Sequence, residues 1–199
     1  MFVGLLLAVT AHAALPEPPD LDPTPEEQAS LARGDVIVRV QDADKGALTI
    51  AAIDVAAPPK AVLDGVLDFG ARAAEVGSIK DVQVYAHRTD TDPEQFGVAW
   101  TLSVIGRSIE FHTLYQVDRA RDFCTYALDP SQPNDLHYVD GSYRAFRIAG
   151  GSRLVYRTTT DAGVAVPNWL RRWLTHGSLE DQLRGIKARA EQSSSGSAL

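Results

Sequence analysis

The sequence has few of the residues, and none of the motifs, that carry most enzyme and metal chemistry. Cys124 is the only cysteine among 199 residues, so the chain can form neither an intrachain disulfide nor a thiolate metal cluster. It contains no glycine-rich dinucleotide or phosphate loop, no H-E-x-x-H and no G-x-S-x-G. No two histidines stand at metal-ligand spacing. We therefore expect no metal and no cofactor, and no residue is predicted to be catalytic.

Two histidines lie near acidic residues. His112 alternates with Glu110 on the polar face of a predicted strand, and His137 follows Asp135 at the edge of a loop. A histidine beside an acid can act as a general base. The pattern here favours ordinary histidines, solvated in the case of His112.

The chain also lacks an excess of basic residues. Its formal net charge is −7, whereas a nucleic-acid-binding protein needs a basic face. The length and the 45% hydrophobic content are typical of one globular domain, large enough to fold without disulfides. We expect a monomer that does not bind nucleic acid.

The N-terminus lacks a hydrophobic run long enough to span a bilayer. Residues 2–9 are apolar and Ala11-His12-Ala13 has a small-x-small pattern, which together indicate a signal peptide over residues 1–13. No Lys or Arg precedes the apolar run, and a buried N-terminal strand or helix is the alternative. The signal-peptide interpretation predicts a periplasmic or secreted protein.

Residues 15–25 contain five prolines and three acidic residues. This composition predicts an extended linker that does not pack. Thr24, Pro25 and Glu27 then have the form of a helix start. Residues 14–30 are therefore assigned to the linker and the start of a short helix.

Residues 31–191 show an α+β pattern. Residues 79–160 alternate apolar and polar side chains with short links, which predicts an antiparallel meander without helices. The C-terminal region carries two apolar stripes that meet at Gly177-Ser178, which predicts a break between a short and a longer helix. Strands are further expected at 36–40 and 48–55, helices at 60–67 and 71–76, and a disordered tail at 192–199.

Aromatic residues recur on the successive predicted strands. Buried tyrosine hydroxyls need hydrogen-bond partners, so these residues indicate either a filled aromatic core or a ligand cavity. Trp169 and Trp173 share one helix face, and Arg171 and Arg172 project from other faces. The two tryptophans either pack on the sheet or form a lid that transiently contacts a membrane. The candidate ligand-contacting residues are Trp100, Leu102, Phe111, Tyr115, Tyr126, Tyr143, Tyr156, Trp169 and Trp173.

Four features of the sequence occur together: a strand-Ala-x-Pro-helix entry at residues 53–62, Leu67-Asp68-Phe69, a late hairpin around Tyr143 and Tyr156, and the final helix. In these features the chain resembles the SRPBCC superfamily of START-like, polyketide cyclase-like and coenzyme Q-binding proteins. The resemblance implies a helix-grip fold, in which a curved antiparallel sheet wraps around a C-terminal helix. Residues 70–75 lack the aromatic and proline residues found there in the family, which predicts a wider or differently gated cavity entrance.

The resemblance also implies a function. The expected protein carries or senses a hydrophobic small molecule such as a lipid, sterol, quinone or fatty acid in an internal cavity. A cyclase or hydratase acting on a hydrophobic substrate is one alternative, although no acid–base pair is evident in the strands. A protein-interaction module of the cell envelope is the other.

Overall fold

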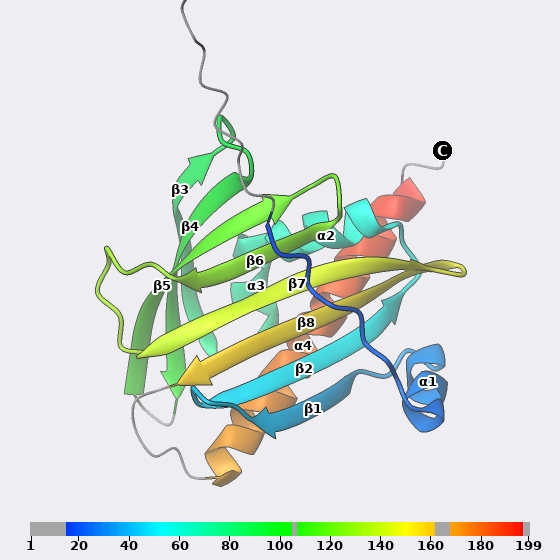
Figure 1. The fold of residues 1–199 in the computed structure, drawn as a ribbon, viewed down its shortest axis with the longest axis horizontal. Coiled ribbons are helices and arrows are strands. Elements are labelled where there is room, and N and C mark those ends of the chain that lie inside the picture. The colour runs from blue at the N-terminus through cyan, green and yellow to red at the C-terminus, as the bar shows by residue number, and fades with distance from the viewer. Residues whose placement is uncertain (1–14, 105–106, 162–167, 197–199) are drawn as a thin grey trace, which may run out of the picture.

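The computed structural model describes residues 15–104, 107–161 and 168–196, and their side chains except at 104, 107 and 168–178. Strands and helices follow the predicted order (Figure 1). The helices are α1 (Pro25–Ala32), α2 (Pro59–Leu67), α3 (Phe69–Glu75) and α4 (Asn168–Gly196). The strands are β1 (Ile37–Asp42), β2 (Ala47–Val55), β3 (Ile79–Arg88), β4 (Glu94–Val104), β5 (Arg107–Asp118), β6 (Phe123–Leu128), β7 (Tyr138–Ile148) and β8 (Gly151–Asp161).

The strands form one curved antiparallel sheet with the order β1-β2-β8-β7-β6-β5-β4-β3. The predicted meander is confirmed as β3 to β8, in which each strand pairs with its neighbour in sequence. On β5, Thr113, Tyr115 and Val117 are buried whereas Leu114 is exposed, as period two requires. The sheet therefore has a concave inner face and a convex outer face.

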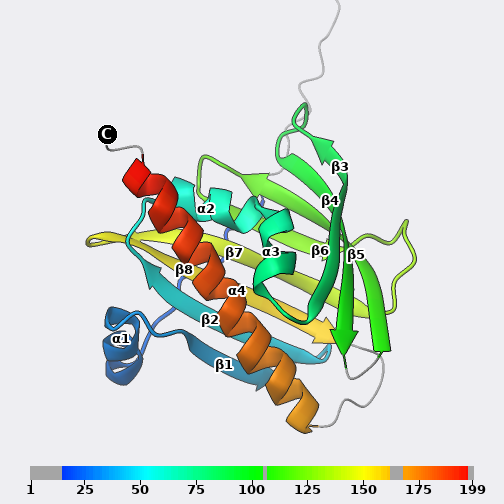
Figure 2. The same cartoon turned by 180° about the vertical axis from the view of Figure 1, so that it is seen from behind.

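Three helices cover the inner face, with α4 lying across the strands (Figure 2). Leu179, Leu183, Ile186 and Ala190 recur at helical spacing and are buried in the main core. At Gly65 an added Cβ would lie 3.3 Å from the Ile186 carbonyl oxygen, so glycine lets α2 approach α4 closely. No helix in the described ranges has the length and apolar composition needed to cross a membrane.

The C-terminal helix differs from the prediction. α4 is a single helix through Gly177 and Ser178 and continues to Gly196, so the predicted break is wrong and the helix extends beyond residue 192. A glycine inside a helix costs only about 1 kcal/mol relative to alanine. Packing of α4 against α2, α3 and β2 is sufficient to offset that cost.

The proline-rich segment also differs from the prediction. Residues 15–23, here called the strap, are extended but pack across the outer face (Figure 1). Pro18 is buried, and Leu21, with 5% exposure, joins a small outer core with Leu31 and Ile37. Four arginines donate to strap carbonyls. Arg121, in the turn between β5 and β6, donates to Leu15, and the strand residues Arg144, Arg157 and Arg39 donate to Pro18, Asp20 and Asp22. The strap therefore packs because residues outside it supply its hydrogen-bond donors and apolar contacts.

Candidate functional site

Four tyrosines form a continuous row across the inner face of the sheet, here called the aromatic row. Tyr115, Tyr126, Tyr143 and Tyr156 lie on the neighbouring strands β5, β6, β7 and β8. Successive ring centroids are 5.0, 5.9 and 4.8 Å apart. Strand register explains the row, because Tyr115 is paired with Tyr126 and Tyr143 with Tyr156.

The hydroxyls of the aromatic row have partners. The Tyr126 hydroxyl donates to that of Tyr156 at 3.1 Å, and Gln182 on α4 donates to the Tyr143 hydroxyl. Gly141 makes room for this arrangement, because a Cβ there would lie 2.5 Å from the Tyr126 hydroxyl oxygen. The C-terminal helix is therefore joined to the row by a polar contact as well as by packing.

Arg72 brings a positive charge to one side of the aromatic row. It lies on α3, which Asp68 caps by accepting from the Ala71 N–H. Phe69 and Arg72 are three residues apart and so share the inward helix face, where each is 2% exposed. The guanidinium carbon of Arg72 lies 5.2 Å from the ring centroids of Phe69 and Tyr143, and 5.4 Å from that of Trp100.

The guanidinium of Arg72 is incompletely satisfied. Its Nη2 donates to the Val66 carbonyl and it hydrogen-bonds with Tyr115. Its Nε is buried without a hydrogen-bond partner. Within the described residues, no carboxylate forms an ion pair with it. A guanidinium offers five N–H donors and stays protonated, so this site has spare capacity for an acceptor.

The tyrosines and the cysteine near Arg72 stay neutral at ordinary pH. Burial raises the pKa of Tyr126 and Tyr143 well above 10. It also raises the pKa of Tyr115, although Arg72 opposes the shift, and it raises the pKa of Cys124 to about 12. General acid–base catalysis works best with a group that titrates near the operating pH. These side chains are suited to hydrogen bonding and apolar contact instead.

Comparison with family models and with curated protein sequences found no match. Solved structures are similar in fold. A STAR-related lipid transfer protein from Xanthomonas axonopodis has a TM-score of 0.64 at 13% identity, over 79% of this chain and 94% of that one. The chain has the helix-grip fold of the SRPBCC type.

Two other helix-grip structures illustrate the range of proteins with this fold. A START superfamily protein from Mycobacterium smegmatis has a TM-score of 0.58 at 20% identity, covering 73% of this chain and 98% of that one. The Zhui aromatase/cyclase from Streptomyces sp. R1128 has a TM-score of 0.57 at 19% identity, covering 73% and 93%. The helix-grip fold predicted from the sequence is confirmed.

The structure brings most of the candidate residues together on the inner face of the helix-grip domain. Trp100 is buried and donates to the Thr113 hydroxyl at 2.8 Å, and Phe111 stacks on it with centroids 6.4 Å apart. Leu102 is half-buried on the same strand. The side chains of Trp169 and Trp173 lie outside the described residues, so the predicted membrane contact stays a prediction.

The sequence-based reasoning missed Arg72. A charged residue between Ala71 and Ala73 is ordinarily a solvated helix position, and nothing in the composition sets it apart. The signal available was its spacing of three from Phe69, which places it on an apolar helix face. The histidines lie elsewhere: His137 is exposed, and His112 is half-buried with Nδ1 2.9 Å from the Pro133 carbonyl oxygen, so it is less solvated than predicted.

Proposed function

We propose that this helix-grip protein binds a hydrophobic small molecule with an acidic or strongly hydrogen-bonding group, and carries or senses it. The observation that supports this most directly is the buried guanidinium of Arg72, which faces aromatic rings and has no carboxylate partner among the described residues. A lone buried charge is expensive to maintain unless it is paired. A ligand carboxylate at this position would provide the pairing.

The chemistry of the inner face favours some ligands over others. Arginine forms short, charge-assisted and often bidentate hydrogen bonds with carboxylates, and aromatic rings supply apolar contact area. A fatty acid offers both kinds of group, whereas a sterol offers a single hydroxyl. Lipid-transfer and aromatase/cyclase proteins with the same fold support a hydrophobic ligand in general. We therefore favour a fatty acid or a similar apolar carboxylate.

We place this function outside the cytoplasm because of residues 1–13, which lie outside the described part of the chain. Their apolar run and Ala11-His12-Ala13 have the form of a signal peptide. A carrier in the periplasm or the medium would shield an apolar carboxylate from water between sites of release and uptake.

A binding titration tests the proposed function. Protein beginning at Ala14 is titrated with palmitate, and binding is followed by tryptophan fluorescence, because Trp100 lies 5.4 Å from the guanidinium carbon of Arg72. We expect Arg72→Gln to weaken palmitate binding at least tenfold, while hexadecanol binds both proteins equally. Arg88→Gln, at an exposed position on β3, is the control. Equal palmitate affinity in Arg72→Gln and the parent protein would contradict the proposal.

A further inference from the structure

A second concave site lies on the opposite face of the sheet from Arg72. It is a groove of about 610 Å³ between the strap and the outer face of β5, β6, β7 and β8. This volume is within the range of about 300–1,000 Å³ that is typical of small-molecule sites. Leu15 and Pro18 of the strap line one side, and Leu48, Leu114 and Ala127 line the sheet side.

The sheet side of the groove is built from neighbouring rows of cross-strand partners. One row is polar: Gln95, Gln116, Thr125, Ser142 and Arg157 are paired in that order from β4 to β8. The next row begins with Leu114 and Ala127, which are paired with each other. Leu114 is 39% exposed, so an apolar surface remains open beside a line of hydrogen-bonding groups.

Arg157 provides the positive charge of this groove, whose lining also includes the acidic residues Glu17 and Asp140. Its Nη2 donates to the Asp20 carbonyl at 3.2 Å, while its Nε is shielded from solvent and has no hydrogen-bond partner. Burial and the nearby charge of Arg39 lower the pKa of Arg157, and the charge of Asp20 opposes this shift only in part. By contrast, Arg144 contacts the Glu17 carboxylate, and Arg39 contacts Glu27.

We propose that the groove between the strap and the outer face binds a small apolar carboxylate, with the carboxylate on Arg157 and the apolar body along Leu114 and Ala127. The preference for an anion is local to Arg157, whose Nε has no partner among the described residues. Of the two acidic residues in the lining, Glu17 already contacts Arg144, and Asp140 lies in the next row, opposite Ala127. The strap makes the site selective for small ligands, since it covers one side of the groove. This site is separate from the inner face and does not depend on the function proposed there.

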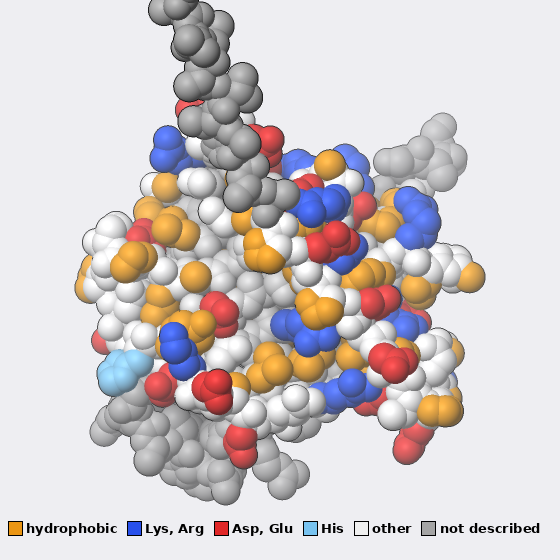
Figure 3. All heavy atoms as spheres, in the orientation of Figure 1, with side chains coloured by type: hydrophobic (Ala, Val, Ile, Leu, Met, Phe, Trp, Pro, Cys, Tyr) orange, Lys and Arg blue, Asp and Glu red, His pale blue; other side chains and the backbone are white. Residues whose placement is uncertain are grey.

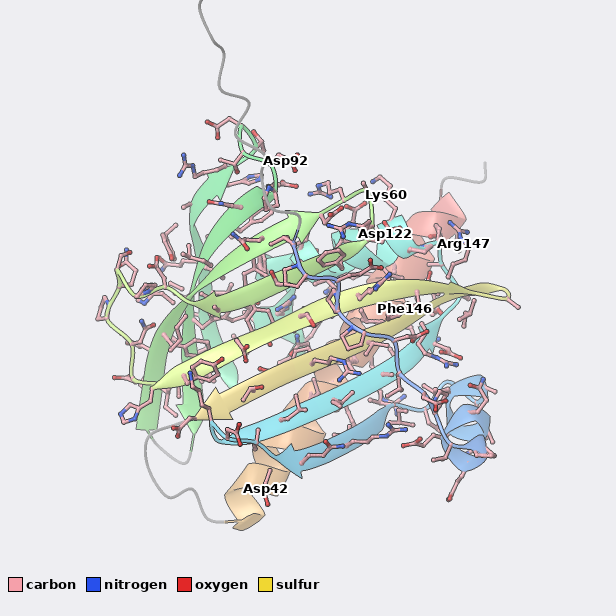
Figure 4. All side chains as sticks on the ribbon, in the orientation of Figure 1. Asp42, Lys60, Asp92, Asp122, Phe146 and Arg147 are labelled. Carbon is pink, nitrogen blue, oxygen red and sulfur yellow. The ribbon has the colours of Figure 1, made fainter. Side chains whose placement is uncertain are left out.

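Phe146 and Arg147 are neighbours on β7 but have different surroundings (Figure 4). Phe146 packs against the outer core that contains Leu21, whereas Arg147 is exposed near the β7–β8 turn. Figure 3 shows basic and acidic side chains intermingled over this face. Arg147 therefore provides a matched control, because its loss changes the net charge equally without altering the groove.

The test is a titration of ¹⁵N-labelled protein, beginning at Ala14, with decanoate and with decanol. We expect decanoate to shift the amide signals of Gln116, Thr125 and Ser142 in a saturable manner. Arg157→Gln should weaken this binding at least tenfold, because it removes a charge-assisted hydrogen bond. Arg147→Gln should leave it within twofold, and decanol should bind the parent and Arg157→Gln equally.

A second variant keeps the test decisive. Leu114→Glu places a like charge where the apolar body would lie, at a position exposed enough to leave the fold intact, and should also weaken decanoate binding at least tenfold. Repeating the titration on Arg72→Gln separates the two sites, because the outer signals should still shift. Shifts confined to inner-face amides, or equal outer-site affinity in Arg157→Gln, would overturn the outer site without affecting the inner one.

Discussion

The guanidinium carbon of Arg72 lies 5.2 Å from the ring centroid of Tyr143, in a site closed to solvent. A cation–π contact of this kind contributes about 1–2 kcal/mol, which is less than the cost of burying an unpaired charge. Two further rings and the hydrogen bonds to Val66 and Tyr115 offset part of that cost, but the Nε of Arg72 has no partner among the described residues. Binding of a ligand anion would explain why an arginine occupies this buried position.

The first prediction concerns stability. Replacing a buried charge with an apolar side chain of similar size is often neutral or stabilising by about 1–4 kcal/mol, so Arg72→Met should not lower the free energy of unfolding in urea titrations. Phe123→Ala, at a fully buried position, should lose about 3–5 kcal/mol. A comparable loss in Arg72→Met would show that Arg72 is a structural residue.

The second prediction concerns alkaline pH. Burial raises the pKa values of Tyr126 and Tyr143 above their ordinary 10.0. Above pH 10 the unfolded chain therefore binds fewer protons than the native protein, and stability falls as pH rises, by about 1.4 kcal/mol per unit for each such tyrosine. Urea titrations at pH 8 to 11 measure the decline. Stability that is constant over this range, with all tyrosines ionising in the folded protein near pH 10, would contradict it.

The third prediction concerns the space beside Tyr126. A Cβ at Gly141 would lie 2.4 Å from the Arg157 carbonyl oxygen and 2.5 Å from the Tyr126 hydroxyl. Overpacking of this kind costs about 1–3 kcal/mol, so Gly141→Ala should lower the melting temperature. Gly70→Ala is the control, because nothing lies within 4 Å of its added Cβ. Equal melting temperatures for the two variants would show that the row tolerates the methyl group.

The fourth prediction concerns the ion pair between Glu27 of α1 and Arg39 of β1 at acidic pH. The hydrogen bond from Arg39 lowers the pKa of Glu27 from 4.5 to about 2. The contribution of this ion pair to the stability of the fold is therefore fully present above pH 4.5 and is lost as pH falls toward 2. Because the pair is partly exposed, we expect it to be worth about 1 kcal/mol. Urea titrations from pH 6 to 2 should show a shallower decline in Glu27→Gln than in the exposed variant Glu26→Gln. Parallel declines would contradict the prediction.

The fifth prediction concerns export. If residues 1–13 are a signal peptide, the protein isolated from its native host begins near Ala14 and is found outside the cytoplasm. N-terminal sequencing and cell fractionation measure both properties. An intact Met1 on a cytosolic protein would contradict this part of the account.

Regular patterns in the sequence were sufficient to predict the sheet and the buried helix face. The alternation on β5 and the spacing of Leu183 and Ile186 each repeat with the period of their element, and both residues of α4 are fully buried. Arg72 and the strap depend instead on tertiary partners. The aromatic rings that enclose Arg72 come from α3, β4 and β7, and the arginines that contact the strap lie up to 137 residues away. Composition alone cannot show such partners.

Native mass spectrometry of the protein purified from its native host tests the central claim most directly. Organic extraction of the same sample then identifies what co-purifies. The account predicts that the parent protein carries a non-covalent apolar acid, and that Arg72→Gln, folded to the same extent, carries at most a tenth as much. The account would be contradicted if both proteins were recovered without a ligand, or if they carried the same molecule at the same occupancy.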